Sequence, residues 1–232
     1  MERLTSTSTF TILVMTVLIL FAGSCKKTDP VAVPTTITDI DGNVYHTISI
    51  GSQVWMVENL RVTKYNDGTA IPQVTDSAAW GNLKTPGYCW YNNNESIYKN
   101  IYGALYNGYV LNTDKKIAPS GWHIPSDTEW MILTTYLGGE NVAGNKLKET
   151  GSQHWSIMNT NATNESGFTA FPGGYRSSSF AKFVGMGTVG NWWSSTPYGY
   201  GFIYRFMDDD EGKVGSNNTN KEFGYSIRCI RD

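Results

Sequence analysis

The chain has 232 residues, in which 18 Lys and Arg stand against 20 Asp and Glu, so its formal net charge at pH 7 is −2. This balance, with no basic run longer than two residues in the sequence, argues against nucleic acid as a partner and against a polybasic membrane patch. The 8 Trp, 14 Tyr and 9 Phe are enough large side chains to fill the core of one domain of roughly 200 residues.

The first segment has the pattern of a bacterial secretion signal. Arg3 precedes an apolar run from Phe10 to Phe21, and small residues then lead to Cys25. The run is shorter than the ~20 apolar residues that a membrane-spanning helix needs. The junction FAGSC resembles a bacterial lipobox, in which the signal is cut before an acylated cysteine. We therefore expect a signal peptide at residues 1–24 and an acyl anchor at Cys25 that holds the chain to a lipid bilayer of the cell envelope, most simply the outer membrane. The alternative is an uncleaved signal anchor or a soluble secreted form.

Residues 25–36 are expected to form a tether to a single domain at residues 37–232. The segment KKTDPVAVPT has few large side chains and two prolines, which is typical of a linker. After it, β-branched and polar residues alternate in TITDIDGNVYHTISIGSQVWMVENL, with turn signals at Asp41-Gly42 and Gly51-Ser52. This pattern predicts a β-meander.

One helix is clearly indicated, from Ser126 to about Leu137. Ser126 and Glu129 have the spacing of a capping box, and Pro125 prevents an earlier start. The run WMILTTYL follows, and two glycines end it. A second, weaker helix is predicted at residues 141–148.

The rest of the chain reads as strands and loops. Residues 61–114 are rich in Tyr, Asn and Gly and predict loops with short strands, whereas residues 168–232 predict strands joined by Gly-rich turns. Strands, then one or two helices, then strands is the order of an α+β domain with antiparallel strands.

Two cysteines follow the anchor. In an oxidising compartment Cys89 and Cys229 could form a disulfide that closes a loop of about 140 residues. Two buried free thiols are the alternative, because sequence alone does not place the two residues within bonding distance.

Blocks of sequence along nearly the whole domain carry a family resemblance. They are DIDGNVYHTISIGSQVWMVENL, KYNDGT, YGALYN, APSGWHIPSDTEW, LGGENVAGNKLKE, NESGFTAFPGGYR, GNWWSST and GYSIRCIRD. In this order they strongly resemble the Fibrobacter succinogenes major paralogous domain, which is found in exported lipoproteins. HIPSDTEW and GYSIRC are also similar to RLPTEAEW and GFRC of the formylglycine-generating enzymes. The resemblance implies a C-type-lectin-like fold and no activity by itself.

The stretch APSGWHIPSDTEW could be the mouth of an active site or a joint between a strand and a helix. In the catalytic interpretation, His123 and Glu129 would be base and acid. The structural interpretation is favoured, because a capping box already engages Glu129 and accounts for Ser126.

Two further motifs resemble ligand-binding sequences but lack the context or spacing that such sites need. The glycines at 185, 187 and 190 match the dinucleotide pattern, with Asp210 twenty residues on, but the following NWWSSTPYGYGF does not read as a helix. The acidic run from Asp208 to Glu211 lacks the spacing of a calcium loop and resembles a solvated hairpin tip. We expect neither a cofactor nor a metal site.

The remaining candidates for a ligand surface are aromatic residues near turns, namely Tyr91 beside Asn92, and Tyr198 with Tyr200. We therefore expect a non-catalytic binding or adhesion module for a glycan or an envelope protein. The alternatives are a formylglycine-generating-enzyme relative with altered chemistry and a purely structural envelope protein. The enzyme is disfavoured because its late cysteine pair is reduced here to Cys229.

Overall fold

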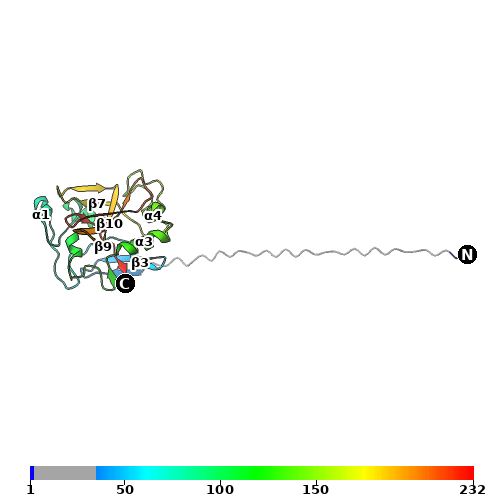
Figure 1. Cartoon of the computed structure of the whole chain (residues 1–232), viewed down its shortest axis with the longest axis horizontal. Coiled ribbons are helices and arrows are strands. Elements are labelled where there is room, and N and C mark those ends of the chain that lie inside the picture. The colour runs from blue at the N-terminus through cyan, green and yellow to red at the C-terminus, as the bar shows by residue number, and fades with distance from the viewer. Residues whose placement is uncertain (3–34) are drawn as a thin grey trace. The chain divides into compact units, whose positions relative to one another are not determined.

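A computed structural model describes residues 1–2 and 35–232 (Figure 1). The predicted signal peptide, the lipid anchor at Cys25 and the tether up to residue 34 lie outside the described residues. Residues 35–232 belong to one compact unit. Within the described ranges, none of the helices combines the length and the apolar character that crossing a bilayer requires.

The described unit is α+β, as predicted. Its helices are α1 Ser77–Asn82, α2 Glu95–Tyr102, α3 Asp127–Tyr136 and α4 Glu140–Leu147, with single 3-10 turns η1 Tyr91–Asn93 and η2 Gly108–Leu111. Its strands are β1 Thr35–Thr38, β2 Val44–Ile50, β3 Gln53–Met56, β4 Tyr88–Cys89, β5 Leu105–Asn107, β6 Trp122–His123, β7 Gly173–Arg176, β8 Phe183–Met186, β9 Val189–Tyr198, β10 Gly201–Asp208, β11 Gly215–Asn220, β12 Gly224–Tyr225 and β13 Ile230–Arg231.

The strands form two sheets that are mostly antiparallel. The smaller sheet has the order β1-β2-β3-β13-β6, and the larger has β11-β10-β9-β7-β12-β5-β4, with β8 paired to β7. In Figure 1, β7, β9 and β10 lie between α1 on one side and α3 and α4 on the other. The only parallel strand pair in the described unit is β7 with β9, and the remaining strand pairs are antiparallel.

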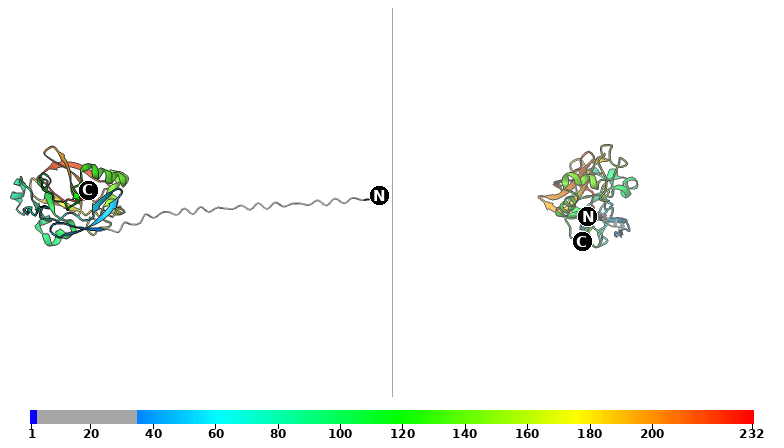
Figure 2. Two further views of the ribbon diagram at one scale, coloured as in Figure 1. Left: turned by 90° about the horizontal axis from the view of Figure 1, so that it is seen from below. Right: turned by 90° about the vertical axis from the view of Figure 1, so that its right-hand side faces the viewer.

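The first sheet joins the two ends of the described unit. The predicted meander is confirmed as β1, β2 and β3, and the sheet is extended by β13 from nearly 180 residues later, where Ile230 pairs with Trp55. Both views in Figure 2 show the C-terminus on the folded unit, where the last two residues are exposed. Strand β1 begins at Thr35, which pairs with Thr47.

Helix α3 begins as the sequence predicts. The Ser126 side chain accepts a hydrogen bond from the Glu129 amide, and the Glu129 carboxylate accepts one from the Ser126 amide at 2.7 Å, so the capping box is confirmed. Trp130 on this helix is fully buried. The second predicted helix is confirmed as α4, one residue earlier at each end.

The expectation of one or two helices is wrong, because α1 and α2 also form. The sequence NNNES was read as a loop, but Asn94 is the N-cap of α2, where its side chain accepts a hydrogen bond from the Ile97 amide. An ion pair between Glu95 and Lys99 at 2.7 Å supports the same helix. Asp76 caps α1 in the same way. In both α1 and α2, a capping side chain starts a helix although the composition is typical of a loop.

The core contains buried cations as well as aromatic rings. All eight tryptophans are at most 7% exposed, and Lys148, Arg176, Arg205 and Arg228 are at most 1% exposed. Arg205 ties the first turns of two helices to β10, because its guanidinium contacts Asp127 of α3 at 2.7 Å and Glu140 of α4 at 2.5 Å. Arg176 donates instead to the backbone carbonyls of Val74, Thr75 and Asp76. Hydrogen bonding of this kind offsets the cost of burying a charge.

Candidate functional site

His123 joins two elements and is not free to act as a base. Its Nε2 lies 2.8 Å from Glu129 Oε1 and its Nδ1 lies 2.7 Å from Asp232 Oδ1, so both ring nitrogens are engaged. Glu129 also accepts hydrogen bonds from Ser126. The arrangement fastens β6 to α3 and to the residue after β13, and it agrees with the structural interpretation of APSGWHIPSDTEW.

The charge of His123 makes this joint sensitive to pH. Burial opposes the charged form, but hydrogen bonds to Asp232 and Glu129 outweigh it, so the pKa of His123 is raised. A raised pKa in the folded state adds stability that is complete below the unfolded value of about 6.5 and is lost as the pH rises through the folded pKa.

Replacing His123 by glutamine is expected to flatten this pH dependence. Wild-type stability should fall between about pH 6 and about pH 8.5, and His123→Gln should fall less, because the variant has no proton to lose at this position. Urea unfolding at the two pH values measures the difference. An equal decline in both proteins would show that His123 does not carry it.

The two cysteines are free and buried, so the structure has no bond between them. Cys89 lies in a small cluster with Trp80 and Tyr91, whereas Cys229 lies in the main core with Tyr106. Burial raises the pKa of Cys89 to about 12, against the opposing effect of Arg176, and burial also raises the pKa of Cys229. Neither thiol is a nucleophile at neutral pH.

The glycine-rich motif forms a β-turn between β8 and β9. Gly185, the third residue of β8, has a positive φ of 78°, Gly187 has a φ of 84°, and the Thr188 amide donates to the Gly185 carbonyl. No helix follows; the chain enters β9, so the geometry of a dinucleotide site is absent from residues 183–198.

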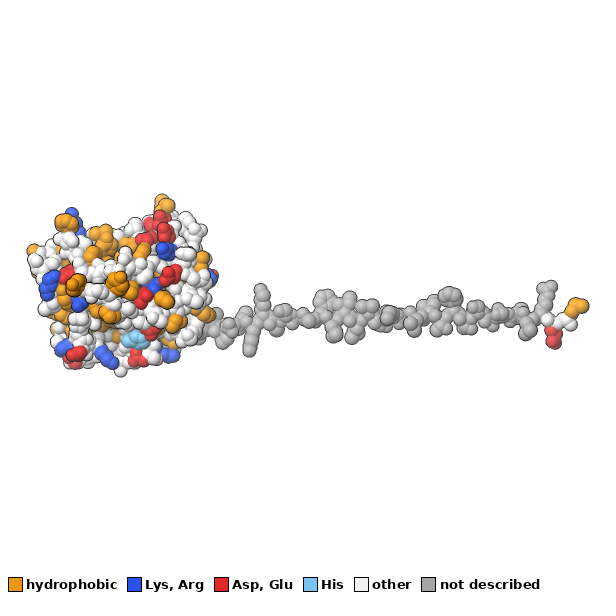
Figure 3. Space-filling model, in the orientation of Figure 1, with side chains coloured by type: hydrophobic (Ala, Val, Ile, Leu, Met, Phe, Trp, Pro, Cys, Tyr) orange, Lys and Arg blue, Asp and Glu red, His pale blue; other side chains and the backbone are white. Residues whose placement is uncertain are grey.

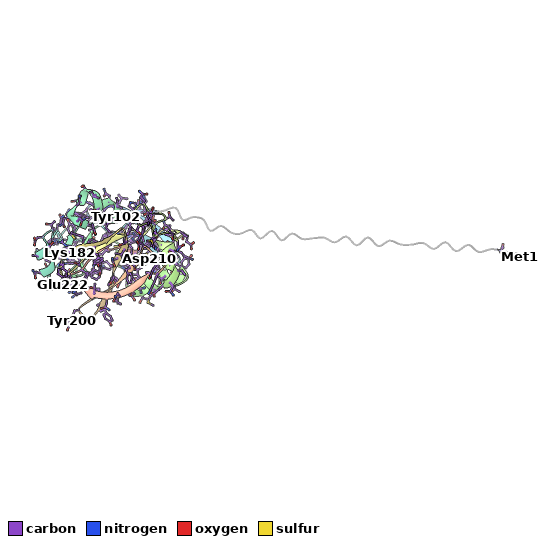
Figure 4. All side chains as sticks on the ribbon, turned by 90° about the horizontal axis from the view of Figure 1, so that it is seen from above. Met1, Tyr102, Lys182, Tyr200, Asp210 and Glu222 are labelled. Atoms are coloured by element: carbon purple, nitrogen blue, oxygen red, sulfur yellow. The ribbon has the colours of Figure 1, made fainter. Side chains whose placement is uncertain are left out.

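The aromatic residues predicted to form a ligand surface do not lie together on one surface. Tyr91 is buried, and its ring packs against Tyr98 and Phe183 with centroids 5.3 Å and 5.2 Å apart, which corrects its assignment to the surface. Asn92 is exposed and has a positive φ, as a turn residue does. Tyr198 and Tyr200 are exposed at the tip of the β9–β10 hairpin, and Tyr200 projects outward in Figure 4.

A groove lies instead on the outer face of the larger sheet. Its volume is about 440 Å³, and its lining comes from the strands β7 to β11 and the turns beside them. In strand register, Asn191 is opposite Phe206, Val189 is opposite Asp208, and Asn217 is opposite Tyr204. Opposed residues of antiparallel strands share a face, so these side chains point to one side of the sheet. Arg205 and Met207 alternate with them and face the helices.

Aromatic rings form the wall of the groove. Tyr175, Tyr204 and Phe206 line it, and each is half-buried. The buried ring of Tyr225 packs under two of them, 4.7 Å from Tyr204 and 5.8 Å from Tyr175. This support holds the rings in place before a ligand arrives.

Carboxylates form one end of the groove. Asp208, Asp209 and Asp210 line it, and no lysine or arginine does. Burial raises the pKa of Asp208, and the neighbouring acids add to the effect. The backbone here is held from inside by Lys148, whose ammonium donates to the carbonyls of Asp208 and Glu211 at 2.8 Å each. The predicted solvated hairpin tip is therefore partly wrong, because its backbone closes over a buried cation.

Asn191 supplies an unpaired donor. The side chain faces the groove and is 5% exposed, and its Nδ2 has no hydrogen-bond partner among the described residues. A buried amide without a partner costs about 1–3 kcal/mol, which a ligand acceptor would recover. An unpaired buried polar group calls for an explanation, and an acceptor on a ligand in the groove would supply one.

The groove could have been found from the alternation in IYRFMDD. Residues 204, 206 and 208 place Tyr, Phe and Asp on one face of a strand, and residues 205 and 207 place Arg and Met on the other. What the sequence does not give is the pairing that brings Tyr175 and Asn191 beside them. On the face drawn in Figure 3, acidic and basic side chains alternate with hydrophobic ones.

The comparisons with known proteins give a family and nothing finer. A family model described as the Fibrobacter succinogenes major domain matches residues 48–231. Neither the curated proteins nor the solved structures contain a match to this chain. Residues 1–2 and 35–232 contain no group of three His, Cys, Asp or Glu arranged to hold a metal ion.

Proposed function

Because this chain belongs to the Fibrobacter succinogenes major domain family, as the match over residues 48–231 shows, we propose that it is a non-catalytic binding module of the bacterial cell envelope. The lipobox-like sequence before Cys25 supports anchoring to a membrane, with the outer membrane as the expected location. The ligand is a glycan or a protein of the envelope or its surroundings.

The groove on the outer face of the larger sheet carries this proposal. It combines three preorganised aromatic rings with three carboxylates and an unpaired amide in a space of about 440 Å³. That volume is within the roughly 300–1,000 Å³ of small-molecule sites. Polar side chains line the groove together with the three rings, which suits a polar ligand such as a glycan.

The engaged state of the reactive side chains supports a non-catalytic role. Both nitrogens of His123 are hydrogen-bonded, and neither His46 nor His154 lines the groove. Neither cysteine lines the groove, and both thiols are neutral. A base with a free nitrogen beside a nucleophile is what an active site would need.

We extend the proposal to the fold, as a C-type-lectin-like arrangement. The pairing of β13 with β3, which closes the unit by joining strands from its two ends, supports it. The similarity of HIPSDTEW and GYSIRC to formylglycine-generating-enzyme motifs points the same way. A C-type-lectin-like fold does not imply an activity of its own.

Removing the aromatic wall is expected to abolish binding. The full chain, purified in detergent, would be tested on a glycan array and against bacterial surface extracts. Tyr204→Ala/Phe206→Ala should weaken any saturable binding by at least about tenfold, because stacking surface is lost. The exposed pair Tyr198→Ala/Tyr200→Ala, at the far end of β10, is the matched control and should bind normally.

A second variant, which fills the groove, tests whether a loss of binding comes from the groove and not from misfolding. Asn217 is exposed and faces the groove, so Asn217→Trp should block ligand without disturbing the core. Loss of binding in both groove variants, with normal circular dichroism, supports the proposal. Loss only in the hairpin pair would move the site to Tyr198 and Tyr200, and no binding by the wild type would favour a structural envelope role.

A further inference from the structure

The groove has the chemistry of a site for a cation, and we propose that its ligand is an amino sugar with a free, protonated amine. This inference rests on the proposed function and names the ligand class of the same groove. It follows from three independent features of the lining, which are its rings, its charge and its single unpaired donor.

The rings suit both parts of such a ligand. The face of a pyranose ring carries C–H groups that pack on an aromatic ring, and the negative face of an aromatic ring attracts an ammonium group within about 6 Å. Tyr175 and Tyr204 are held in place by Tyr225, and Phe206 lies 5.9 Å from Tyr204. A flexible neutral ligand would use only the packing.

The negative charge at the end of the groove has no cationic side chain beside it in the lining. Asp208 and Asp210 have no hydrogen-bond partner for their carboxylates among residues 35–232, whereas Asp209 accepts one from Ser156. The ammonium of Lys148 acts on Asp208 from inside, but it is buried behind the loop and donates to backbone carbonyls. A ligand ammonium would therefore meet free carboxylates on the open side.

Asn191 distinguishes an amino sugar from a simple amine. Its Nδ2 needs an acceptor, and its side chain shares a face with its register partner Phe206, which lies two residues from Asp208 on the same strand. A 2-amino sugar carries a hydroxyl oxygen on C3, next to the carbon that bears the amine. One sugar unit can therefore place its ammonium at the carboxylates and this oxygen at Asn191. Acetylation would remove the charge and leave Asp208 and Asp210 facing a neutral amide.

The test compares oligosaccharides that differ only in acetylation. Binding of a glucosamine tetramer and of an N-acetylglucosamine tetramer to the full chain in detergent would be measured by titration calorimetry at about pH 6, where the amine is protonated. The glucosamine tetramer is expected to bind at least about tenfold more tightly, and its affinity should fall with added salt.

Two variants locate the charge requirement. Asp208→Asn/Asp210→Asn should remove the preference for the free amine, and Asn suits position 208 because burial already disfavours the charged form there. The control is Asp114→Asn/Glu165→Gln, which removes two exposed acids away from the groove and changes the net charge equally. It should keep the preference.

The outcomes separate this inference from the proposed function. Equal binding of both tetramers, lost in Asn217→Trp, would overturn the amine requirement and leave a glycan-binding groove. Binding of tetralysine with no binding of the glucosamine tetramer would overturn the assignment to a sugar. If neither tetramer binds and an array glycan that binds is unaffected by Asn217→Trp, both this inference and the placement of the site are wrong.

Discussion

Replacing Arg228 by methionine is expected to lower the free energy of unfolding by about 3 kcal/mol. The guanidinium is fully buried, donates to Asn59 Oδ1 at 2.9 Å and to the Phe168 carbonyl, and lies over the Phe168 ring. Charge-assisted hydrogen bonds contribute about 1.5–3 kcal/mol each, and the variant would leave the Phe168 carbonyl without a donor. The relief of a buried charge opposes these losses.

Two controls separate charge from position. Burial lowers the pKa of Arg228 to about 9, which leaves it charged at neutral pH, so Arg228→Lys keeps the charge but loses the planar fork. That variant should recover only part of the stability. Arg231→Met makes the same substitution at an exposed site and should change stability by no more than about 0.5 kcal/mol. Urea unfolding is the measurement, and an Arg228→Met protein as stable as wild type would show that desolvation dominates.

Replacing Trp55 by alanine is expected to cost about 3–5 kcal/mol. Trp55 on β3 is fully buried between the smaller sheet and α3, with its ring centroid 4.9 Å from Trp130 and 5.6 Å from Phe168. Its Nε1 donates to Gln53 Oε1 at 3.1 Å. The substitution leaves a cavity and removes the ring contacts that join the sheet to the helix.

A graded series tests this explanation by unfolding in urea. Trp55→Phe retains a ring and should lose less than Trp55→Ala. Tyr200→Ala removes an aromatic side chain that is 97% exposed and should be nearly neutral. A loss as large for Tyr200→Ala as for Trp55→Ala would contradict burial as the cause.

The elements predicted correctly from sequence are those with local signals. The capping box at Ser126, the turn at Gly42 and the alternating strands β2 and β3 depend on residues within a few positions of one another. Helix α2 had a local signal too, in Asn94 as a cap, but three asparagines in a row concealed which one caps.

The groove depends on pairing between distant segments, which single-sequence patterns do not specify. Tyr175 comes from β7 and Asn191 from β9, and only the strand order places them beside Tyr204. The same holds for Tyr91, which was predicted to be exposed because asparagines follow it. Its burial comes from Phe183, more than 90 residues away.

The pairing of Ile230 with Trp55 has a consequence for the order of events in the cell. Strand β3 cannot gain its neighbour β13 until residue 230 has been synthesised, so the smaller sheet is incomplete throughout translation. A sheet closed by so distant a contact forms late and slowly. The described unit would therefore complete its fold only after its last residues have been synthesised.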